Sequence, residues 1–216
     1  MQNLRNIILN ITNIEYKDIG VLFDKCEVKE QVLAELDRIK NFYLTKASVS
    51  KQNRYLINVS GIPGAGKTTY CKKILETSKE FNYISFDEIM EQISHYKIDA
   101  NVNQREAFLT WEAPAKILGY EILIELLLKG SPILFEHSSA NYEHLELFKY
   151  IKEHLGYKIE MVFIPIALKD ALSRIKKRER ATKRYIPEEI IVDRKFFLQE
   201  AIPKYKKIVD VYKEAK

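Results

Sequence analysis

Residues 55–69 of the chain read YLINVSGIPGAGKTT. Within them, residues 61–68 match the pattern G-x-x-x-x-G-K-[ST] of a phosphate-binding loop. An apolar run that suits a buried strand precedes the loop, and a helical pattern from Lys67 to about Ser78 follows it. A glycine-rich turn without a nucleotide remains the alternative, but strand, loop and helix in this order favour a triphosphate site. The residues expected to contact the nucleotide are Gly61, Ile62, Pro63, Gly64, Ala65, Gly66, Lys67, Thr68 and Thr69.

Each residue type in this loop has a physical reason. The glycines permit positive φ and let the backbone approach phosphate oxygens closely. Successive backbone N–H groups form an anion-binding concavity, and the following helix adds the positive end of its dipole. We expect Lys67 to reach the β- and γ-phosphates and the Thr68 hydroxyl to bind Mg²⁺. The loop does not indicate which base is bound, so ATP and GTP both remain candidates.

Outward from the loop, short apolar runs alternate with helical patterns. Further strands are predicted at 82–86, 132–137 and 158–166, with helical regions at 88–129, 142–154 and 168–181. Gly130 and Gly156 are predicted to end helices, and Pro187 and Pro203 each to lie in the first turn of one. This alternation predicts an α/β, three-layer P-loop NTPase fold with a mostly parallel central sheet.

The chain before the loop is expected to form an N-terminal helical extension. Apolar residues recur at helical spacing over 28–45, and we expect this helix to cover an edge of the sheet, with binding of a partner as the alternative. A polar connector follows. We therefore divide the chain into an extension at 1–50 and a kinase-type domain at 51–216, with a basic lid near 169–186.

Composition limits the class of protein. The formal net charge is +5, with 46% hydrophobic and 30% charged residues, as expected for a globular chain. Residues 169–216 hold 15 Lys and Arg against 8 Asp and Glu, which suggests an anionic partner or a solvated helical surface. Cys26 and Cys71 have no metal-ligand spacing and are expected to be reduced thiols. We see no signal peptide and no apolar run long enough to span a membrane, so we expect a cytoplasmic protein.

Two acidic residues follow predicted strands. Asp87 lies at the end of the second strand, where it would accept the proton of an acceptor hydroxyl or hold Mg²⁺ through water; a simple helix N-cap is the alternative. Glu136 directly follows the apolar run PILF and is expected to contact substrate or to bind Mg²⁺ through water; a polar residue that merely ends the strand is the alternative. The carboxyl ends of parallel strands share one edge of the sheet, so both carboxylates would face one crevice.

The segment 173–184, SRIKKRERATKR, is strongly basic. We expect Arg178 and Arg184 to close over the phosphates, since an arginine supplied by the same chain stabilises the charge of the transition state. Lys176, Lys177 and Lys183 are expected to be solvated. A purely nucleic-acid-binding role for the whole segment is the other alternative.

Among other polar and aromatic residues, His137 is the histidine expected nearest the crevice and is a candidate substrate contact. His144 and His154 are predicted to lie on helix surfaces. Trp111 and Tyr120 are expected to pack in the core rather than stack on a ligand. No N-K-x-D guanine motif and no second glycine-rich signature is present, which argues against a GTPase or a motor ATPase.

From about Tyr55 to about Ile190 the chain resembles the zeta-toxin family of P-loop kinases, with a relation to the polynucleotide-kinase-like enzymes. The resemblance rests, in order, on GIPGAGKTT, YISFD, AKILGYEILIELLLKG, PILFEHSS, HLGYKIEMVFIPI, KKRER and KRYIP. It implies that Lys67 and Thr68 bind triphosphate and Mg²⁺, that Asp87 is the catalytic base, that Arg178 and Arg184 contact phosphates, and that Glu136 contacts substrate. It also implies a UDP-linked amino sugar as phosphoryl acceptor and an antitoxin protein as partner.

The chain departs from the family pattern on the acceptor side. The His-Pro pair that the family often carries after the catalytic aspartate is missing from EIMEQISHY, and His137-Ser138 replaces a glycine-threonine pair. A small-molecule kinase is therefore the main hypothesis. A 5′-hydroxyl polynucleotide kinase, for which nucleic acid is a less favoured partner, and a nucleotide-binding module without turnover are the alternatives.

Overall fold

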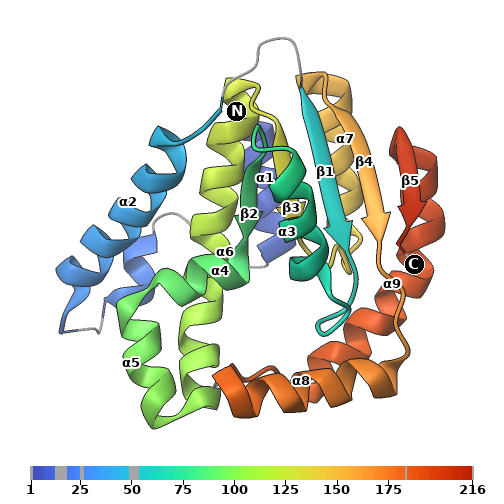
Figure 1. Ribbon diagram of the computed structural model, residues 1–216. Helices are drawn as coiled ribbons and strands as arrows, with labels where there is room; N and C mark the ends of the chain where they lie inside the picture. Colours follow the sequence, from blue (N-terminus) through green and yellow to red (C-terminus); the bar gives the residue numbers. More distant parts are fainter. Residues whose placement is uncertain (1, 13–18, 25–26, 49–53, 183, 216) are drawn as a thin grey trace.

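The computed structural model describes residues 2–12, 19–24, 27–48, 54–182 and 184–215, and its centre is a five-stranded sheet (Figure 1). The strands lie in the order β2-β3-β1-β4-β5, and every neighbouring pair is parallel. The α/β fold with a parallel central sheet is confirmed. The strand bounds are β1 Tyr55–Ser60, β2 Asn82–Ser85, β3 Ile133–Glu136, β4 Lys158–Phe163 and β5 Val211–Glu214.

The sheet carries helices on both faces because successive side chains of its strands point to opposite faces, and both faces bury apolar residues. On β1, Ile57 and Val59 face α3 (Lys67–Thr77) in one apolar cluster with Cys71. Leu56 belongs to the larger cluster on the other face. That face is covered by α1 (Gln2–Thr12), α6 (Gln104–Lys129) and α7 (Glu143–Leu155), so the fold has three layers (Figure 1).

The long helical region predicted at 88–129 is three helices. They are α4 (Phe86–Gln92), α5 (Ser94–Val102) and α6. Asn103 separates the last two, since its side chain accepts hydrogen bonds from the N–H groups of Arg105 and Glu106 and so caps α6. Gly130 and Gly156 end α6 and α7 with φ of 73° and 68°, as predicted from their residue type.

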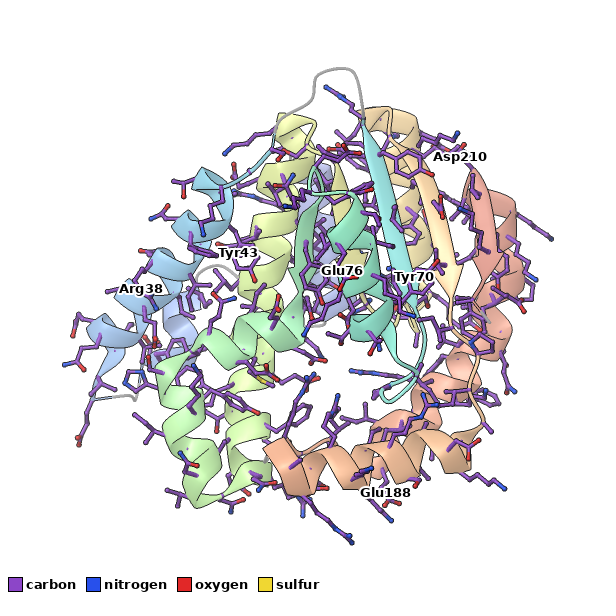
Figure 2. The ribbon with its side chains drawn as sticks, in the orientation of Figure 1. Arg38, Tyr43, Tyr70, Glu76, Glu188 and Asp210 are labelled. Atoms are coloured by element: carbon purple, nitrogen blue, oxygen red, sulfur yellow. The ribbon has the colours of Figure 1, made fainter. Side chains whose placement is uncertain are left out.

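The predicted helix before the loop is α2 (Lys29–Thr45). It packs against α6 and the short 3₁₀-helix η1 (Ile19–Phe23), so the expectation that it covers the sheet edge is wrong. Its stripe of Val32, Leu36 and Ile39 is buried in the main core. Figure 2 shows Arg38 on its outer side and Tyr43 on its inner side, where the Tyr43 hydroxyl accepts a hydrogen bond from Gln92 Nε2 at 2.9 Å.

The C-terminal part contains α8 (Leu168–Thr182), α9 (Glu188–Ile208) and β5. Pro203 lies inside α9, so its predicted place in a first turn is wrong; buried Leu198, Ala201 and Tyr205 hold the helix through the proline. Pro187 occupies the N-cap position of α9 rather than its first turn. β5 was not predicted from the sequence.

β5 is a short edge strand with little apolar pattern, and a polar contact places it. Asp210 precedes the strand and accepts a hydrogen bond from the Ile159 backbone N–H at 2.8 Å. It also forms an ion pair with Lys152 at 2.9 Å (Asp210 is labelled in Figure 2). Cys71 is buried in the fold, as expected for a structural thiol, whereas Cys26 lies outside the described residues. Within the described ranges, no helix is both long and apolar enough to cross a membrane.

Candidate active site

A pocket opens beyond the carboxyl ends of β1, β2 and β3, next to the residue 61–68 loop. This is the edge where ligands bind in open parallel sheets. Figure 1 shows α8 lying across the same end of the molecule. The pocket is lined by Pro63, Lys67, Ser85, Phe86, Asp87, Met90, Phe108, Glu112, Ala115, Lys116, Glu136, His137, Ser138, Ile186 and Arg194.

The loop has the backbone that its glycines predict. Gly61, Gly64 and Gly66 have φ of 150°, 83° and 101°. A Cβ at Gly64 would lie 2.8 Å from the carbonyl oxygen of Ala171, so the loop packs directly on α8. The adjacent helix α3 begins at Lys67 and directs its positive end at the loop.

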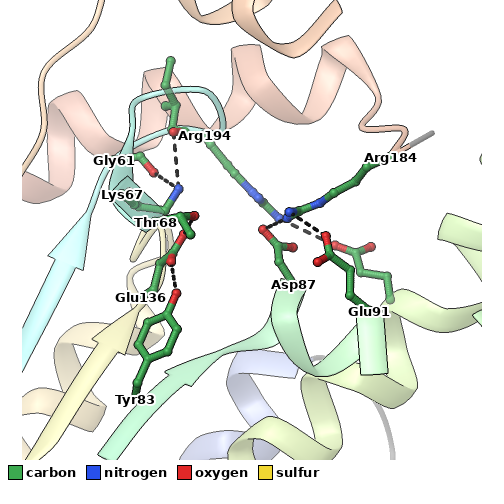
Figure 3. Close-up of polar contacts among 11 residues, drawn as sticks. Gly61, Lys67, Thr68, Tyr83, Asp87, Glu91, Glu136, Arg184 and Arg194 are labelled. Carbon is green, nitrogen blue, oxygen red and sulfur yellow. Dashed lines mark hydrogen bonds and ion pairs between the residues drawn. The ribbon is translucent and has the colours of Figure 1, made fainter. Parts of the chain in front are cut away.

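Lys67 lies folded over this loop. Its Nζ donates to the carbonyl oxygens of Gly61 at 3.0 Å and Ile62 at 3.4 Å (Figure 3). Burial lowers the pKa of Lys67, and the carboxylates of Glu136 and Asp87 oppose that shift. A partly buried ammonium aimed at the loop is suited to a phosphate oxygen, whose charge would compensate its lost hydration.

Glu136, the last residue of β3, links this strand to α3 and β2 beside the loop. One of its carboxylate oxygens accepts a hydrogen bond from Thr68 Oγ1 at 2.8 Å, and the other accepts one from the Tyr83 hydroxyl (Figure 3). Its exposed fraction is 6%. Tyr83 comes from β2, and burial followed by the charge of Glu136 raises its pKa, so it remains a protonated donor.

Asp87 lies in the first turn of α4, while Ser85 occupies the N-cap position. The simple N-cap alternative for Asp87 is therefore wrong. Its carboxylate forms an ion pair with Arg184, whose Nη1 also donates to Glu91 Oε1 at 3.1 Å (Figure 3). Burial alone would raise the pKa of Asp87, but the charges of Arg184, Lys67 and Arg194 outweigh it and hold that pKa below its usual value.

The predicted lid arginines lie where α8 and the following loop approach this aspartate. Arg178 is half-buried on α8, and its positive charge contributes to lowering the pKa of Asp87. Arg184 is brought to the same place from beyond the end of α8. Lys176 and Lys177 are exposed, as expected, whereas Lys183 lies outside the described residues. Arg174 was not predicted; its Nη1 donates to the Gly64 carbonyl at 3.3 Å.

The structure adds residues in and beside the pocket that the sequence did not indicate. Arg194 extends from α9 into the site (Figure 3), and its Nη2 lies 3.6 Å from Glu112 Oε1. Glu112 also pairs with Lys116 at 2.8 Å, one turn further along α6. These residues stand in helices with many charges, so no local pattern distinguishes them from solvated ones. Tyr83 is likewise one of many aromatic residues in strand-like runs.

The positions of the histidines differ in part from those predicted. His137 lines the pocket, as expected for a candidate substrate contact. His144 is fully buried, so its predicted surface position is wrong: its Nε2 lies 2.8 Å from the Tyr120 hydroxyl, and its ring stacks on His137. Burial lowers the pKa of His144 to about 3. His154 is exposed, as predicted.

The two aromatic residues predicted to lie in the core are confirmed there. Trp111 is 4% exposed and Tyr120 2% exposed. Both belong to the main apolar cluster on the α6 face of the sheet. Each satisfies its polar group within the fold, since Trp111 Nε1 donates to Asp99 Oδ2 at 2.7 Å.

The chemistry of the loop fits Mg²⁺ bound with a triphosphate. The described residues contain no cluster of three or more His, Cys, Asp or Glu that could hold an ion alone. Mg²⁺ at phosphate sites takes one or two protein oxygens and completes its shell with water and phosphate oxygens. The Thr68 hydroxyl, adjacent to Glu136, supplies oxygen ligands of this kind.

A family model described as zeta toxin matches residues 40–215. Among solved structures, a chain of the PezAT chromosomal toxin-antitoxin system of Streptococcus pneumoniae superposes with a TM-score of 0.66 at 17% identity, over 86% of this chain and 77% of that one. A chain of the AvrRxo1-ORF1:ORF2 complex with ATP gives 0.59 at 14% identity, over 82% and 60%. A chain of the Pnkp1/Rnl/Hen1 RNA repair complex gives 0.51 at 16% identity, over 69% and 45%.

At these identities the structural matches establish a shared fold. This chain spans less than two thirds of the AvrRxo1 and Pnkp1 chains that it matches. No curated protein matches its sequence.

Proposed function

The chain belongs to the zeta toxin family of P-loop kinases, and we propose that it transfers the γ-phosphoryl group of ATP or GTP to a hydroxyl of a small molecule. The observation that carries this proposal is the arrangement of charges around one pocket. Lys67 and the loop lie on one side, and Asp87 with Arg184 lies on the other (Figure 3). A triphosphate on the loop would place its last phosphate between them.

Each residue then has a defined task. Lys67 and the loop N–H groups bind the β- and γ-phosphates, and Arg178, Arg184 and Arg194 face the charge of the transferring group. Asp87 orients the acceptor hydroxyl and accepts its proton. Thr68, held by Glu136, would carry the Mg²⁺, which neutralises phosphate charge when bound.

Asp87 acts mainly by position rather than by basicity. Its pKa lies below the usual value, so it is a weak proton acceptor. Such a carboxylate is suited to a reaction with a loose transition state, in which the hydroxyl loses its proton late. The ion pair with Arg184 also places the lid arginine beside the reacting group.

For the acceptor we propose a UDP-linked amino sugar, and for a protein partner an antitoxin. The proposal is supported by family membership and by the likeness to a chain of a toxin-antitoxin system. The pocket offers Glu136, His137 and Ser138 beside Asp87, a polar set suited to an acceptor with several hydroxyl or carbonyl groups. A cytoplasmic location remains a prediction.

A 5′-hydroxyl polynucleotide kinase is the second candidate. The specific observation in its favour is the basic outer side of α8, where Lys169, Lys176, Lys177 and Arg180 border one surface hollow. A chain of an RNA repair complex shares the fold. An oligonucleotide acceptor predicts binding that weakens steeply with salt, because phosphate contacts release counterions.

One experiment separates these candidates. The protein is incubated with γ-labelled ATP or GTP and, in parallel, with UDP-amino sugars, nucleosides, RNA with 5′-hydroxyl ends and a cell metabolite extract. Label on a UDP-amino sugar supports the main proposal, and label on RNA ends supports the second. Tight triphosphate binding with no labelled product from any acceptor would identify a binding module and contradict both.

A further inference from the structure

His137 is the pocket residue whose protonation the surrounding backbone determines. The Ser139 backbone N–H points at His137 Nδ1 from 3.0 Å. A backbone amide can only donate, so Nδ1 must be the unprotonated ring nitrogen. In the neutral ring the proton is then on Nε2. No hydrogen bond from a described residue occupies that nitrogen.

The residue that makes this contact is itself tightly held. Ser139 has φ of 55°, and it is the non-glycine residue with positive φ among those the structure describes. Such a conformation costs energy and persists where surrounding contacts enforce it. Its Oγ donates to Asn58 Oδ1 at 2.9 Å, and its carbonyl accepts from the Tyr205 hydroxyl at 2.9 Å.

The neighbouring residue is fixed as well. The Ser138 carbonyl accepts a hydrogen bond from Ser60 Oγ at 2.6 Å, so the loop that follows β3 is tied to β1 on one side and to α9 on the other. Ser60 and Ser139 are fully buried. The N–H of Ser139 is therefore aimed by the sheet and by α9, and solvent does not compete for it.

The plane of the imidazole is also set by packing. The ring stacks on His144 with centroids 4.3 Å apart and planes 2° from parallel, and it lies near parallel to Phe135 at 5.2 Å. His144 is in turn fixed by Tyr120. With one ring nitrogen bound and one face covered, the Nε2 edge is what remains for a ligand in the pocket.

Burial and the positive groups around the ring keep it neutral. Burial, then the neighbouring His144 and the cation of Arg194, lower the pKa of His137 well below its usual value. Lys116 and Lys67 act in the same direction. A second ring proton would also place an N–H against the N–H of Ser139.

We propose that His137 is a neutral hydrogen-bond donor, fixed as the Nε2–H tautomer by Ser139, that binds an uncharged oxygen of the phosphoryl acceptor. The inference rests on the proposed function, because it assigns this ring to the acceptor side of the same pocket. The matching group is a carbonyl or hydroxyl oxygen near the reacting hydroxyl, since Lys67, Lys116 and Arg194 are the partners that the pocket offers to anionic groups. His137 is thereby a specificity-determining residue rather than a second base.

The tautomer can be measured without any acceptor. In protein labelled with ¹⁵N, His137→Gln identifies the His137 signals. We expect Nδ1 to give an unprotonated resonance with a coupling across the hydrogen bond to the Ser139 amide, and Nε2 to give a protonated one. Tyr205→Phe removes the hydrogen bond to the Ser139 carbonyl and should weaken that coupling. Tyr157→Phe is the matched control, because this buried tyrosine donates to the Ser131 carbonyl at 2.9 Å, away from the pocket. Averaged tautomers or a protonated Nδ1 in the native chain would overturn the proposal.

The donor role is tested with UDP-N-acetylglucosamine as the probe, by calorimetric binding and by the shift of the Nε2 proton. His137→Phe keeps the stacking ring but lacks the donor, and should weaken binding about 10-fold, the usual effect of leaving a polar partner unpaired. His137→Gln, which retains an N–H, should recover part of the loss, while ATP affinity stays unchanged in both. Equal affinity in His137→Phe, or no binding of the probe to the native chain, would overturn the donor role. Binding without phosphorylation would leave it standing and count against the proposed kinase activity instead.

Discussion

At the level of single residues, the ion pair between Asp87 and Arg184 determines the charge state of the proposed base. Asp87 is surrounded by positive groups from three places: Lys67 in the loop, Arg184 after α8 and Arg194 in α9. Their sum keeps the carboxyl ionised although the carboxylate is partly removed from water. The pH dependence of the reaction therefore tests whether this ion pair sets the charge of Asp87.

The carboxylate of Asp87 should remain ionised throughout the usual assay range. Its pKa is held below its ordinary value of 3.8, so the share of kcat/KM that depends on the ionised form is lost only as pH falls below that value. Arg184→Gln removes the strongest opposing charge, and burial then raises the Asp87 pKa. We expect the acid limb of kcat/KM to move to higher pH in this variant.

The measurement is kcat/KM from pH 4.5 to 8 for both proteins, with Arg180→Gln as control because Arg180 is exposed on α8. In this range the native protein should show no acid limb, whereas kcat/KM of Arg184→Gln should fall as the pH is lowered. Identical profiles in the two proteins would show that the pair does not set the charge of Asp87.

Tyr83 is a second residue whose effect can be isolated. Its hydroxyl and that of Thr68 share the Glu136 carboxylate, so removing the phenol leaves Glu136 less firmly oriented toward Thr68. Residues that orient metal ligands typically change metal affinity 10–100-fold. We expect Tyr83→Phe to raise the Mg²⁺ concentration for half-maximal rate about 10-fold.

Tyr55→Phe provides the comparison, since Tyr55 donates to Glu160 at 2.6 Å on the same sheet but away from the loop. An unchanged Mg²⁺ requirement in Tyr83→Phe would remove Tyr83 from the site.

Residue roles were predictable only where a motif carried them. Lys67 and Thr68 follow from the loop pattern, and Asp87 follows from its place after a strand. Arg194 reaches the pocket through the packing of α9, and Tyr83 reaches Glu136 through the pairing of β2; the local sequence specifies neither. His144 was misplaced because its residue type suggested a solvated position. Its spacing of four and seven residues from Phe148 and Ile151 places it on the buried face of α7, against Tyr120 and His137.

At the level of elements, the phosphate loop and α8 form one packed unit. Ile62 of the loop shares an apolar cluster with Ala171 and Ile175 of α8, and Gly64 touches the Ala171 backbone. The lid helix α8 thus packs so closely on the loop at Gly64 that no side chain would fit there. Apolar runs in the sequence predicted strands β1 to β4, whereas the packing of α8 on the loop depends on this tertiary contact.

Gly64→Ala tests the seating. A Cβ would meet the Ala171 carbonyl at 2.8 Å and would also carry the strain of φ 83°, at a cost of about 1–3 kcal/mol for the strained backbone alone. Gly66→Ala has a similar backbone strain, with φ of 101°, but its Cβ would meet nothing within 4 Å. We expect a larger fall in Tm for Gly64→Ala, measured by thermal unfolding without nucleotide. An equal or smaller fall would mean that the loop and α8 are not tightly seated.

At the level of the whole molecule, the N-terminal helices belong to the main core. Leu4 and Ile8 of α1 and Val32 of α2 lie in the same buried cluster as residues of β1, α6 and α7. Separation of 1–50 as an extension stays a prediction about domains, and this burial argues that the two parts fold together. The sequence could not indicate it, because an amphipathic helix does not specify the surface that it covers.

Leu4→Ala measures how far the N-terminal part supports the rest. Leu4 is 0% exposed, and truncating a buried leucine typically costs 2–5 kcal/mol. For a chain of this size each kcal/mol lowers Tm by about 2–4 °C. We expect one cooperative transition at lower temperature, by calorimetry. Leu22→Ala is the control, at a leucine that is 40% exposed. If Leu4→Ala behaves like this control, the N-terminal helices are a separable unit.

The central claim, phosphoryl transfer from a triphosphate on the loop to a hydroxyl at Asp87, is tested most directly by assaying transfer from γ-labelled ATP or GTP in site variants. Native protein and Lys73→Ala, which changes an exposed lysine of α3, should label the acceptor at similar rates. Lys67→Ala and Asp87→Ala should each lower the rate at least about 10³-fold, because they remove phosphate neutralisation and proton acceptance, while their thermal unfolding shows an intact fold. Asp87→Ala protein that still labels the acceptor at the native rate would contradict the account.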